Sequence, residues 1–522
     1  MKLINKTVLK RNEYFDSITL MVISREISRL PGVDDASVVM GTEANKRLLD
    51  QAGLLSDEAR RGTANDLIIS FRAEESNAEK ILVDINRLFQ RKRGAGAAKD
   101  TYQPKTLRAA VKSCPSSNIV VISVAGRYAA EEAQEALQRG LHVMLFSDNV
   151  SINDELSLKT YARKNGLLLM GPGAGTAIIN GAALGFANAL PRGPVGIVAA
   201  AGTGLQEVST ILARHGIGIT QGIGTGGRDL SQEIGGIMML EGLKALQEDN
   251  TTEIIALISK PPALVVAQKI LNQVARSAKP TVICFLGAGS IGGEETAHIY
   301  HVQTLQECAL RCAKLAGTSF ADLDQHQEIE ANRLSNLATN LVRELQPEQR
   351  FLRGLYSGGT LCYEAQWILS RMLREPIYSN VPLSKSNKMT DSMVSRDHCV
   401  IDLGEEEFTV GRPHPMIDND LRIRRIQQEA RDRDVAAIIL DIVIGYGAHP
   451  DPGGELAAAI YKAKQIAQKE GRELVFIGSV TGTEADPQGL SHQVRTLEST
   501  GMVVCQSNAA AAKLAGMIVS IK

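Results

Sequence analysis

The chain has 522 residues, of which 44% are apolar and 22% charged, with 57 basic residues against 58 acidic ones. This length predicts several domains, and a net charge of −1 argues against an extensive nucleic-acid interface. The first residues are too polar for a signal peptide, and no uncharged apolar stretch reaches the roughly 20 residues that cross a bilayer. We expect a cytoplasmic protein without membrane or nucleic-acid partners.

Residues 1–92 alternate three times between strand-like and helix-like segments. This order is typical of a ferredoxin-like or ACT-like α+β unit, a fold that by itself does not decide function. Residues 91–105, RKRGAGAAKDTYQPK, combine charge, glycine and proline without periodicity. They predict a linker.

From residue 106 onward, continuous apolar strands alternate with helices, which predicts an α/β fold with parallel sheets covered on both faces. Residues 106–190 contain a partial doubly wound domain. Two further α/β series occupy residues 191–320 and 350–522, and a polar helical stretch at about 320 to 348 separates them.

The two later series resemble a divergent internal repeat. Each opens with a strand that runs through a glycine turn into a helix, at residues 201–203 and 358–360. Such a repeat predicts a site between the halves. A Gly-Thr pair after a buried strand is also simply a good turn and helix cap, and the pattern leaves both interpretations open.

Each glycine turn leaves unpaired N–H groups and a partial positive charge at a helix start. Glycine permits close approach of a ligand, and a threonine adds a hydroxyl. We therefore predict a phosphate or carboxylate site, without a metal, formed by Gly202, Thr203, Gly204, Gly358, Gly359 and Thr360. Neither turn has a Walker motif or a dinucleotide-binding glycine pattern.

Two other segments could contribute to this site. Gly226 and Gly227 precede Arg228 and Asp229 in a loop that could close over a ligand. In the alternative, the glycines form a turn and Asp229 caps the next helix. Lys260 ends an apolar strand before two prolines, at the sheet edge where ligands bind in parallel α/β folds. A solvated lysine at a strand end is the alternative.

A third segment, GRPHPMID at residues 411–418, places His414 between two prolines with Arg412 and Asp418 close in sequence. The imidazole could bind an anion or transfer a proton. A structural histidine bonded to backbone is equally possible. Residues 481–488, TGTEADPQ, join a strand end to a helix and could face the same crevice.

The seven cysteines are scattered along the chain, a pattern that favours free thiols over disulfides. Cys308 and Cys312 lie one helical turn apart, but no second pair or nearby histidine completes a zinc set. We predict no metal site.

The segments GIVAAAGTGLQE, LLLMGPGAGTAIINGAALGFANA, GGRDLS and VGRPHPMID resemble the FdrA family, which is related to succinyl-CoA synthetases, and the resemblance covers nearly the whole chain. It implies that residues 106–190 are a CoA-binding-type Rossmann domain and that 191–320 and 350–522 are flavodoxin-like ligase-type domains. Two activities are implied: acyl-CoA synthetase, and subunit of an oxamate carbamoyltransferase in allantoin degradation.

The departures from the synthetase pattern favour the second activity. The Gly-His-Ala-Gly loop with the phosphohistidine is missing after TVICFLGAG, and Lys260 replaces the glutamate that orients that histidine. The glycine loop that grips CoA phosphates has no counterpart before residue 106, and no ATP-grasp domain is present. By this comparison CoA and ATP are doubtful cofactors, and carbamoyl phosphate is the expected substrate. Lys260 and Arg228 would help the helix starts to hold its phosphate, with His414 and Arg412 at a second anionic pocket.

The sequence thus predicts a subunit that transfers a carbamoyl or acyl group. An acyl-CoA ligase is the first alternative, and a non-catalytic assembly or regulatory subunit is the second. In the synthetase fold one catalytic surface comes from another subunit. We therefore expect protein partners and a homo-oligomer.

Overall fold

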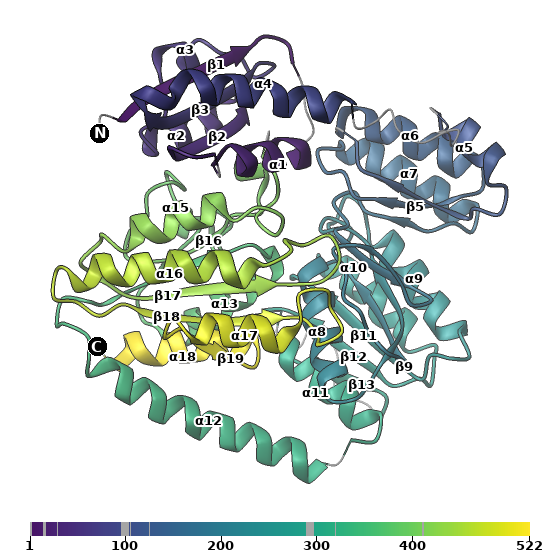
Figure 1. Ribbon diagram of the computed structural model, residues 1–522. Helices are drawn as coiled ribbons and strands as arrows, with labels where there is room; N and C mark the ends of the chain where they lie inside the picture. The colour runs from purple at the N-terminus through teal and green to yellow at the C-terminus, as the bar shows by residue number, and fades with distance from the viewer. Residues whose placement is uncertain are drawn as a thin grey trace. The chain divides into compact units, whose positions relative to one another are not determined.

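A computed structural model describes residues 3–13, 17–28, 30–94, 104, 106–124, 126–288, 297–318, 320–409 and 412–521 (Figure 1). The chain forms two compact units. The first contains Met1–Gln103 and Leu403–Arg424, and the second contains Pro104–Asp402 and Arg425–Lys522. None of the described helices is long and apolar enough to cross a membrane.

The N-terminal part of the first unit is an antiparallel sheet of strand order β1-β3-β2 with helices packed on it. Its elements are β1 (Leu3–Lys10), α1 (Ser17–Ser28), β2 (Val33–Met40), α2 (Glu43–Gln51), α3 (Asp57–Arg60), β3 (Leu67–Glu74), η1 (Glu75–Asn77) and α4 (Ala78–Gly94). Apolar residues spaced by three or four, such as Leu20, Ile23 and Ile27, bury one face of α1. The predicted element order is confirmed. Helix α4 extends four residues into the predicted linker, and most of that linker lies outside the described residues.

The segment Leu403–Arg424 belongs to this first unit, although the sequence analysis places it within the domain at 350–522. Arg424 carries the attachment: its two terminal nitrogens lie 3.0 Å from the two carboxylate oxygens of Asp35 on β2, and its Nε lies 3.0 Å from the carboxylate of Asp420. A bidentate pair of this kind depends on tertiary structure, so a local pattern does not reveal it.

The second unit begins with a parallel sheet of order β4-β5-β6, as predicted for the partial doubly wound domain. Its elements are α5 (Leu107–Ser113), β4 (Ile119–Ile122), α6 (Gly126–Gln138), β5 (His142–Leu145), α7 (Ile152–Lys164) and β6 (Leu169–Met170).

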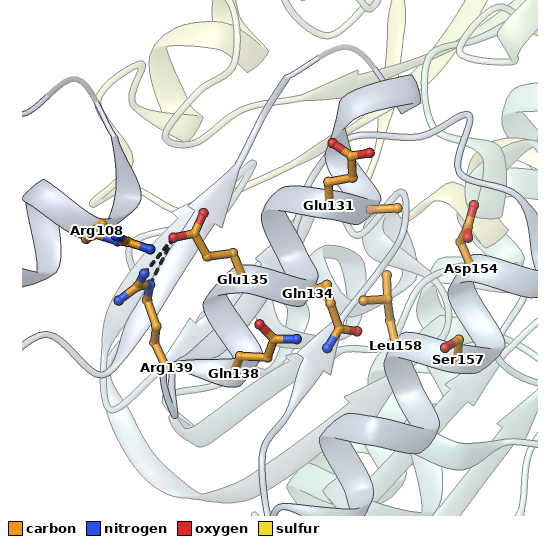
Figure 2. Close-up of a pocket in the computed structure, with 10 residues that line it drawn as sticks. Arg108, Glu131, Gln134, Glu135, Gln138, Arg139, Asp154, Ser157 and Leu158 are labelled. Carbon is orange, nitrogen blue, oxygen red and sulfur yellow. Dashed lines mark hydrogen bonds and ion pairs between the residues drawn. The ribbon is translucent and has the colours of Figure 1, made fainter.

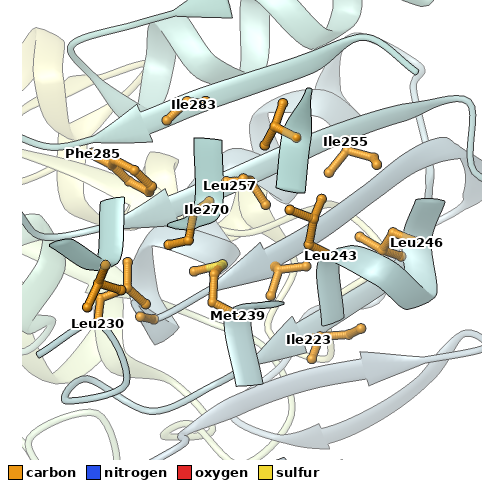
Figure 3. Close-up of a cluster of buried hydrophobic side chains, with 14 of the residues drawn as sticks. Ile223, Leu230, Met239, Leu243, Leu246, Ile255, Leu257, Ile270, Ile283 and Phe285 are labelled. Carbon is orange, nitrogen blue, oxygen red and sulfur yellow. The ribbon is translucent and has the colours of Figure 1, made fainter. Parts of the chain in front are cut away.

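A seven-stranded sheet of order β13-β12-β11-β9-β10-β7-β8 follows. Its strands are β7 (Thr176–Ile179), β8 (Ala182–Gly185), β9 (Arg192–Ala199), β10 (Ile219–Gly224), β11 (Ile254–Ser259), β12 (Thr281–Phe285) and β13 (Ile299–His301). Its helices are α8 (Gly202–Arg214), α9 (Ile237–Glu248), α10 (Leu264–Val274) and α11 (Leu305–Leu315). Figure 3 shows apolar side chains of α9 and α10 packed on β11 and β12. Burial on both faces explains why these strands are apolar throughout.

A six-stranded parallel sheet of order β15-β16-β14-β17-β18-β19 completes the unit after the long helix α12 (Phe320–Val342). Its strands are β14 (Phe351–Tyr356), β15 (Ile377–Tyr378), β16 (His398–Asp402), β17 (Val435–Val443), β18 (Val475–Thr481) and β19 (Val503–Cys505). The helices after α12 are α13 (Gly359–Met372), η3 (Lys385–Asn387), α14 (Glu406–Thr409), α15 (Asp420–Glu429), α16 (Pro452–Gln468), α17 (Leu490–Glu498) and α18 (Asn508–Ile521). Helix α14 and the first turns of α15 lie in the segment assigned to the first unit.

The two larger sheets support the predicted internal repeat. In each, the strand before the glycine turn lies between two parallel neighbours: β9 between β10 and β11, and β14 between β16 and β17. Glu207 of α8 accepts a hydrogen bond of 2.9 Å from the N–H of Asn508, the first residue of α18. In the opposite direction, Glu364 of α13 accepts one of 2.7 Å from the N–H of Leu305, the first residue of α11. Each half therefore caps a helix of the other half.

Candidate functional site

The starts of helices α8 and α13 meet, as expected for two equivalent helix ends at a shared site. A Cβ atom placed on Gly358 would lie 2.8 Å from the methyl carbon of Thr203. A Cβ atom placed on Gly204 would lie 3.0 Å from the methyl carbon of Thr360. The glycines at these positions thus allow the two helix ends to approach closely.

A carboxylate of the protein already occupies the turn that leads into α13. Asp441 of β17 accepts hydrogen bonds from the N–H groups of Ser357 and Gly358, both 2.7 Å long, and from the Ser357 hydroxyl at 3.0 Å. Its side chain is fully buried. The chain thus supplies its own anion where the sequence analysis expected a ligand.

Lys260 lies beside the same turn, together with Asp402 at the end of β16. A Cβ atom on Gly359 would lie 3.7 Å from Lys260 Nζ and 2.5 Å from a carboxylate oxygen of Asp402. The ammonium also lies 5.8 Å from the centre of the Tyr363 ring. Lys260 therefore joins the predicted helix starts, and two acidic side chains accompany it.

Neither helix is capped by the side chain of its N-cap residue, and the start of α8 differs because no carboxylate is among its described hydrogen-bond partners. Ala201, which precedes the helix, has no side-chain cap hydrogen bond. The hydroxyl of Thr203 is buried without a hydrogen-bond partner, and the residue retains only 9% of its surface. A buried hydroxyl without a partner beside an uncapped helix start suits an oxyanion ligand.

The loop with Gly226, Gly227, Arg228 and Asp229 has internal partners. Asp229 accepts hydrogen bonds from the N–H groups of Met238 and Met239 near the start of α9, as in the capping alternative. It also accepts a hydrogen bond of 2.8 Å from Lys159.

Arg228 is 44% exposed and pairs with Glu155 at 2.8 Å. Gly226 has φ +89°, and a Cβ there would lie 2.6 Å from the carbonyl oxygen of Pro172, whereas a Cβ on Gly227 would meet open space. The described contacts connect this loop to α7 and to the loop after β6. They do not connect it to the starts of α8 and α13.

Arg412, His414 and Asp418 belong to the first compact unit, whereas the helix starts belong to the second. His414 Nδ1 accepts a hydrogen bond of 3.2 Å from the N–H of Met416, so this nitrogen is unprotonated. Burial, reinforced by the charge of Arg422, lowers the pKa of His414 to about 4. The imidazole is therefore neutral at pH 7, which disfavours it as a proton donor. Asp418 accepts a hydrogen bond of 3.1 Å from the N–H of Asp420.

Residues 481–488 connect parts of the second unit. The Thr481 hydroxyl donates to Glu207. Asp486 accepts hydrogen bonds from the side chain of Asn188 and from the N–H groups of Ala189 and Thr483. These described contacts hold the loop against the segment between β8 and β9.

A surface hollow of about 560 Å³ contains none of the predicted site residues. Figure 2 shows it lined by residues of α6 and α7 with Arg108 of α5, and it shows Arg139 engaged with Glu135. Three carboxylates line it against two arginines. This charge pattern does not suit an anionic substrate.

All seven cysteines are free. A hydrogen bond to Cys284, together with burial, raises the pKa of the Cys308 thiol. A hydrogen bond with Cys308, together with burial, also raises the pKa of the Cys312 thiol. Neither cysteine is therefore a reactive thiolate at neutral pH. Among the described residues, no group of three or more His, Cys, Asp or Glu side chains could hold a metal ion.

Sequence reasoning missed Asp402, Asp441, Glu207 and Glu364. A signal for Asp441 existed, since it is the one charged residue of β17, whose sequence is VAAIILDIV. A charged residue in a buried strand requires partners. The loop expected to lack the phosphohistidine includes residues 289–296, which lie outside the described residues.

Three domain families match the chain. A CoA-ligase domain matches residues 355–518, a CoA-binding domain matches residues 192–287, and the heavy metal-associated domain of AllF matches residues 1–105. The CoA-binding match falls on the sheet around β9, a region that the resemblance assigned to the first ligase-type domain, and not on residues 106–190. The α/β fold with CoA-ligase-type domains is confirmed.

The chain is 44% identical over 504 residues to the uncharacterized protein YahF of Escherichia coli, covering 96% of both chains. It is 29% identical to the alpha subunit of the ADP-forming succinate–CoA ligase of Aquifex aeolicus, covering 30% of this chain and 51% of the subunit. Among solved structures, the dinucleotide-forming acetyl-coenzyme A synthetase 1 of Ca. Korarchaeum cryptofilum is 13% identical, with a TM-score of 0.34, covering 81% of this chain and 88% of that chain.

The heavy metal-associated match raises the question of whether the N-terminal part could hold such a metal. Residues 1–105 contain no cysteine and no histidine. Soft heavy metals prefer thiolate ligands, so these residues do not fit a site of that kind. We assign no metal chemistry to this part of the chain.

Proposed function

The chain belongs, with YahF, to the FdrA family of succinyl-CoA-synthetase-like proteins, and from this premise we propose that it transfers a carbamoyl group from carbamoyl phosphate to the nitrogen of a small amide such as oxamate. The observation that carries the proposal is the uncapped start of α8 with its buried, unpartnered Thr203 hydroxyl. Lys260 lies near it, at the Gly359 turn.

In this proposal the phosphate group of carbamoyl phosphate binds at the α8 start. The N–H groups of the first helical turn and the Thr203 hydroxyl donate to its oxygens, and Lys260 supplies a positive charge. The bond from the carbamoyl carbon to the phosphate oxygen breaks while a bond to the acceptor nitrogen forms. The donors stabilise the charge that grows on the departing phosphate. The proton lost by the acceptor nitrogen can leave with that phosphate, and no base from the His414 segment is required.

The asymmetry of charge supports one phosphate site and not two. Asp441 already satisfies the turn into α13, and Asp402 adds a second carboxylate there. A dianionic phosphate at the α13 start would meet both acids. The α8 start has no carboxylate among its described hydrogen-bond partners, which is why we place the phosphate there.

A second candidate function is acyl-CoA ligase. The CoA-ligase and CoA-binding matches, and the likeness to succinate–CoA ligase subunits, favour it. The chain spans only about half the length of the ligase subunit, so we rank this function second.

Phosphate release separates the two functions. We would measure it with carbamoyl phosphate plus oxamate and, in parallel, with ATP plus CoA plus succinate, each with and without co-purified proteins. Release only with carbamoyl phosphate and oxamate supports the transferase. Release only with ATP and CoA replaces the proposal with the ligase, and no release under any condition favours a non-catalytic subunit.

Calorimetry with CoA gives an independent check. We expect weak binding or none, because the proposed transfer uses carbamoyl phosphate and no CoA. A micromolar dissociation constant, corresponding to about −8 kcal/mol, would restore the ligase as the leading function.

A further inference from the structure

The GRPHPMID segment contains a buried arginine, Arg412, whose side chain has no described hydrogen bond. The side chain of Arg412 retains 7% of its surface, and its Nε–H is buried without a partner. Its one described charged contact is Asp420 at 3.8 Å, beyond hydrogen-bond length. Burial lowers the pKa of the Arg412 guanidinium from its usual value. A guanidinium cannot escape this cost by losing its proton, so the cation persists.

The carboxylate of Asp420 does not offset the cost of burying the Arg412 charge, because Arg424 binds that carboxylate. Arg424 Nε lies 3.0 Å from both carboxylate oxygens of Asp420. The same arginine binds Asp35 through its two terminal nitrogens. One segment thus contains one fully paired arginine and one that lacks close partners.

We propose that Arg412 is the anchor of a carboxylate-binding site within the segment Leu403–Arg424. A planar carboxylate fits the guanidinium edge with two parallel hydrogen bonds, and it would satisfy the Nε–H. A monoanion suits the position better than a phosphate dianion, because Asp418 and Asp420 both act electrostatically on Arg412.

This site goes beyond the proposed function, because Arg412 belongs to the first compact unit and the helix starts belong to the second. Oxamate carries a carboxylate next to its amide, and oxamide is the matched probe in which a second amide replaces that carboxylate. Inorganic phosphate is the third probe, because it tests the other common oxyanion.

The decisive experiment is thermal denaturation of the full chain and its variants with each probe. In the wild type we expect stabilisation by oxamate and not by oxamide or phosphate. Arg412→Met should melt at or above the wild-type temperature without ligand, since it removes a poorly paired buried charge, and should bind oxamate at least about 10-fold more weakly. Arg412→Lys should restore part of the binding. Arg424→Met is the matched control, and it should lower the melting temperature because it breaks two close ion pairs.

Three results would overturn the site. Arg412→Met could melt below the wild type and keep oxamate-dependent stabilisation, which would make Arg412 structural. Oxamide could stabilise the wild type as well as oxamate does, which would show that the site does not recognise a carboxylate. Phosphate could stabilise the wild type as well as oxamate does, which would show that the site binds phosphate.

The failure of the proposed function gives a different result. If wild-type protein binds oxamate through Arg412 but releases no phosphate from carbamoyl phosphate, the function fails and the site remains. If turnover occurs and Arg412→Met keeps the stabilisation by oxamate, the site fails and the function remains.

Discussion

The starts of α8 and α13 occupy equivalent positions in the two halves of the second unit, yet they differ in how their N–H groups are satisfied. At α13, Asp441 accepts three hydrogen bonds, and Asp402 lies beside Gly359. At α8, no carboxylate is among the described hydrogen-bond partners of the turn, and the Thr203 hydroxyl has no partner.

The neighbouring strands explain the difference. In β16, Asp402 lies next to Tyr356 across the sheet, and in β17 Asp441 directly follows Leu440, which lies next to Leu355, whereas Gly224 and Ile258 lie next to Ala199 in the first half. Two acidic residues thus lie at the turn into α13, and Asp441 satisfies two of its N–H groups. The other helix start is open to a ligand.

The largest expected effect comes from removing the anion of the protein itself. Asp441→Ala leaves two N–H groups and one hydroxyl buried without an acceptor, and it should lower the free energy of unfolding by about 3 to 5 kcal/mol. Urea denaturation measures this loss.

Ser479→Ala is the matched control, because Ser479 lies next to Asp441 on β18 and its buried hydroxyl has no hydrogen-bond partner. We expect a change within about 1 kcal/mol. Equal losses in the two variants would show that Asp441 does not hold the α13 turn.

The reciprocal caps predict a pH dependence of stability. Burial raises the pKa of Glu364 to about 7 from its ordinary 4.5. The contribution of the protonated Glu364 carboxyl to the free energy of unfolding is therefore fully present below pH 4.5. It is lost as the pH rises through 7, by about 3 kcal/mol in total. Denaturation at several pH values between 4.5 and 8 measures the slope.

In Glu364→Gln the side chain is neutral at every pH, so the free energy of unfolding should change less with pH than in the parent. If the parent and the variant show the same pH profile over this range, the Glu364 carboxyl does not titrate there.

Lys260→Ala should weaken binding of a phosphate-bearing substrate. Losing one charge-assisted contact costs about 1.5 to 3 kcal/mol, which corresponds to roughly 10-fold to 150-fold in affinity. Lys260→Arg should recover part of this loss, because its larger planar group places the charge elsewhere. Transfer kinetics at subsaturating carbamoyl phosphate, with circular dichroism as the fold control, provide the measurement. Wild-type kinetics in a folded alanine variant would remove Lys260 from the phosphate site.

The smallest effect compares the two threonines directly. Thr203→Val keeps the shape and removes the unpartnered hydroxyl, so stability without ligand should hold while phosphate-bearing substrate binds about 3-fold to 10-fold more weakly. Thr360→Val changes the equivalent position at α13 and should leave that affinity unaltered. The affinities come from calorimetry with carbamoyl phosphate, and equal effects of the two variants would contradict a single site at α8.

Most of the fold could be predicted because its signals are local. Apolar runs identified the strands of the parallel sheets, and apolar residues at helical spacing identified α1 and α4. The glycine turns before α8 and α13 also followed from local sequence. The attachment of Leu403–Arg424 to the first unit did not, because it depends on the pairing of Arg424 with Asp35, which lies 389 residues away.

The candidate site was predicted only in part, for a related reason. Lys260 could be placed at a sheet edge because it ends a strand. Asp441 fills the α13 turn because β17 is the neighbour of β14. The order of strands in a sheet cannot be inferred from the sequence of either strand alone. Arg228 and Asp229 illustrate the converse, since their partners Glu155 and Lys159 come from a helix that the loop pattern does not reveal.

The exchange of helix caps between the halves also affects how the protein is made. Glu207 leaves the ribosome 301 residues before the N–H of Asn508 that it binds, and α18 is the last helix of the chain. Until α18 is synthesised, the Glu207 carboxylate in the first half lacks this partner, so the first half cannot reach its final state before then. Glu364 pairs across only 59 residues with Leu305, which precedes it, and so finds its partner already synthesised. The first half therefore completes its fold only after α18 is synthesised.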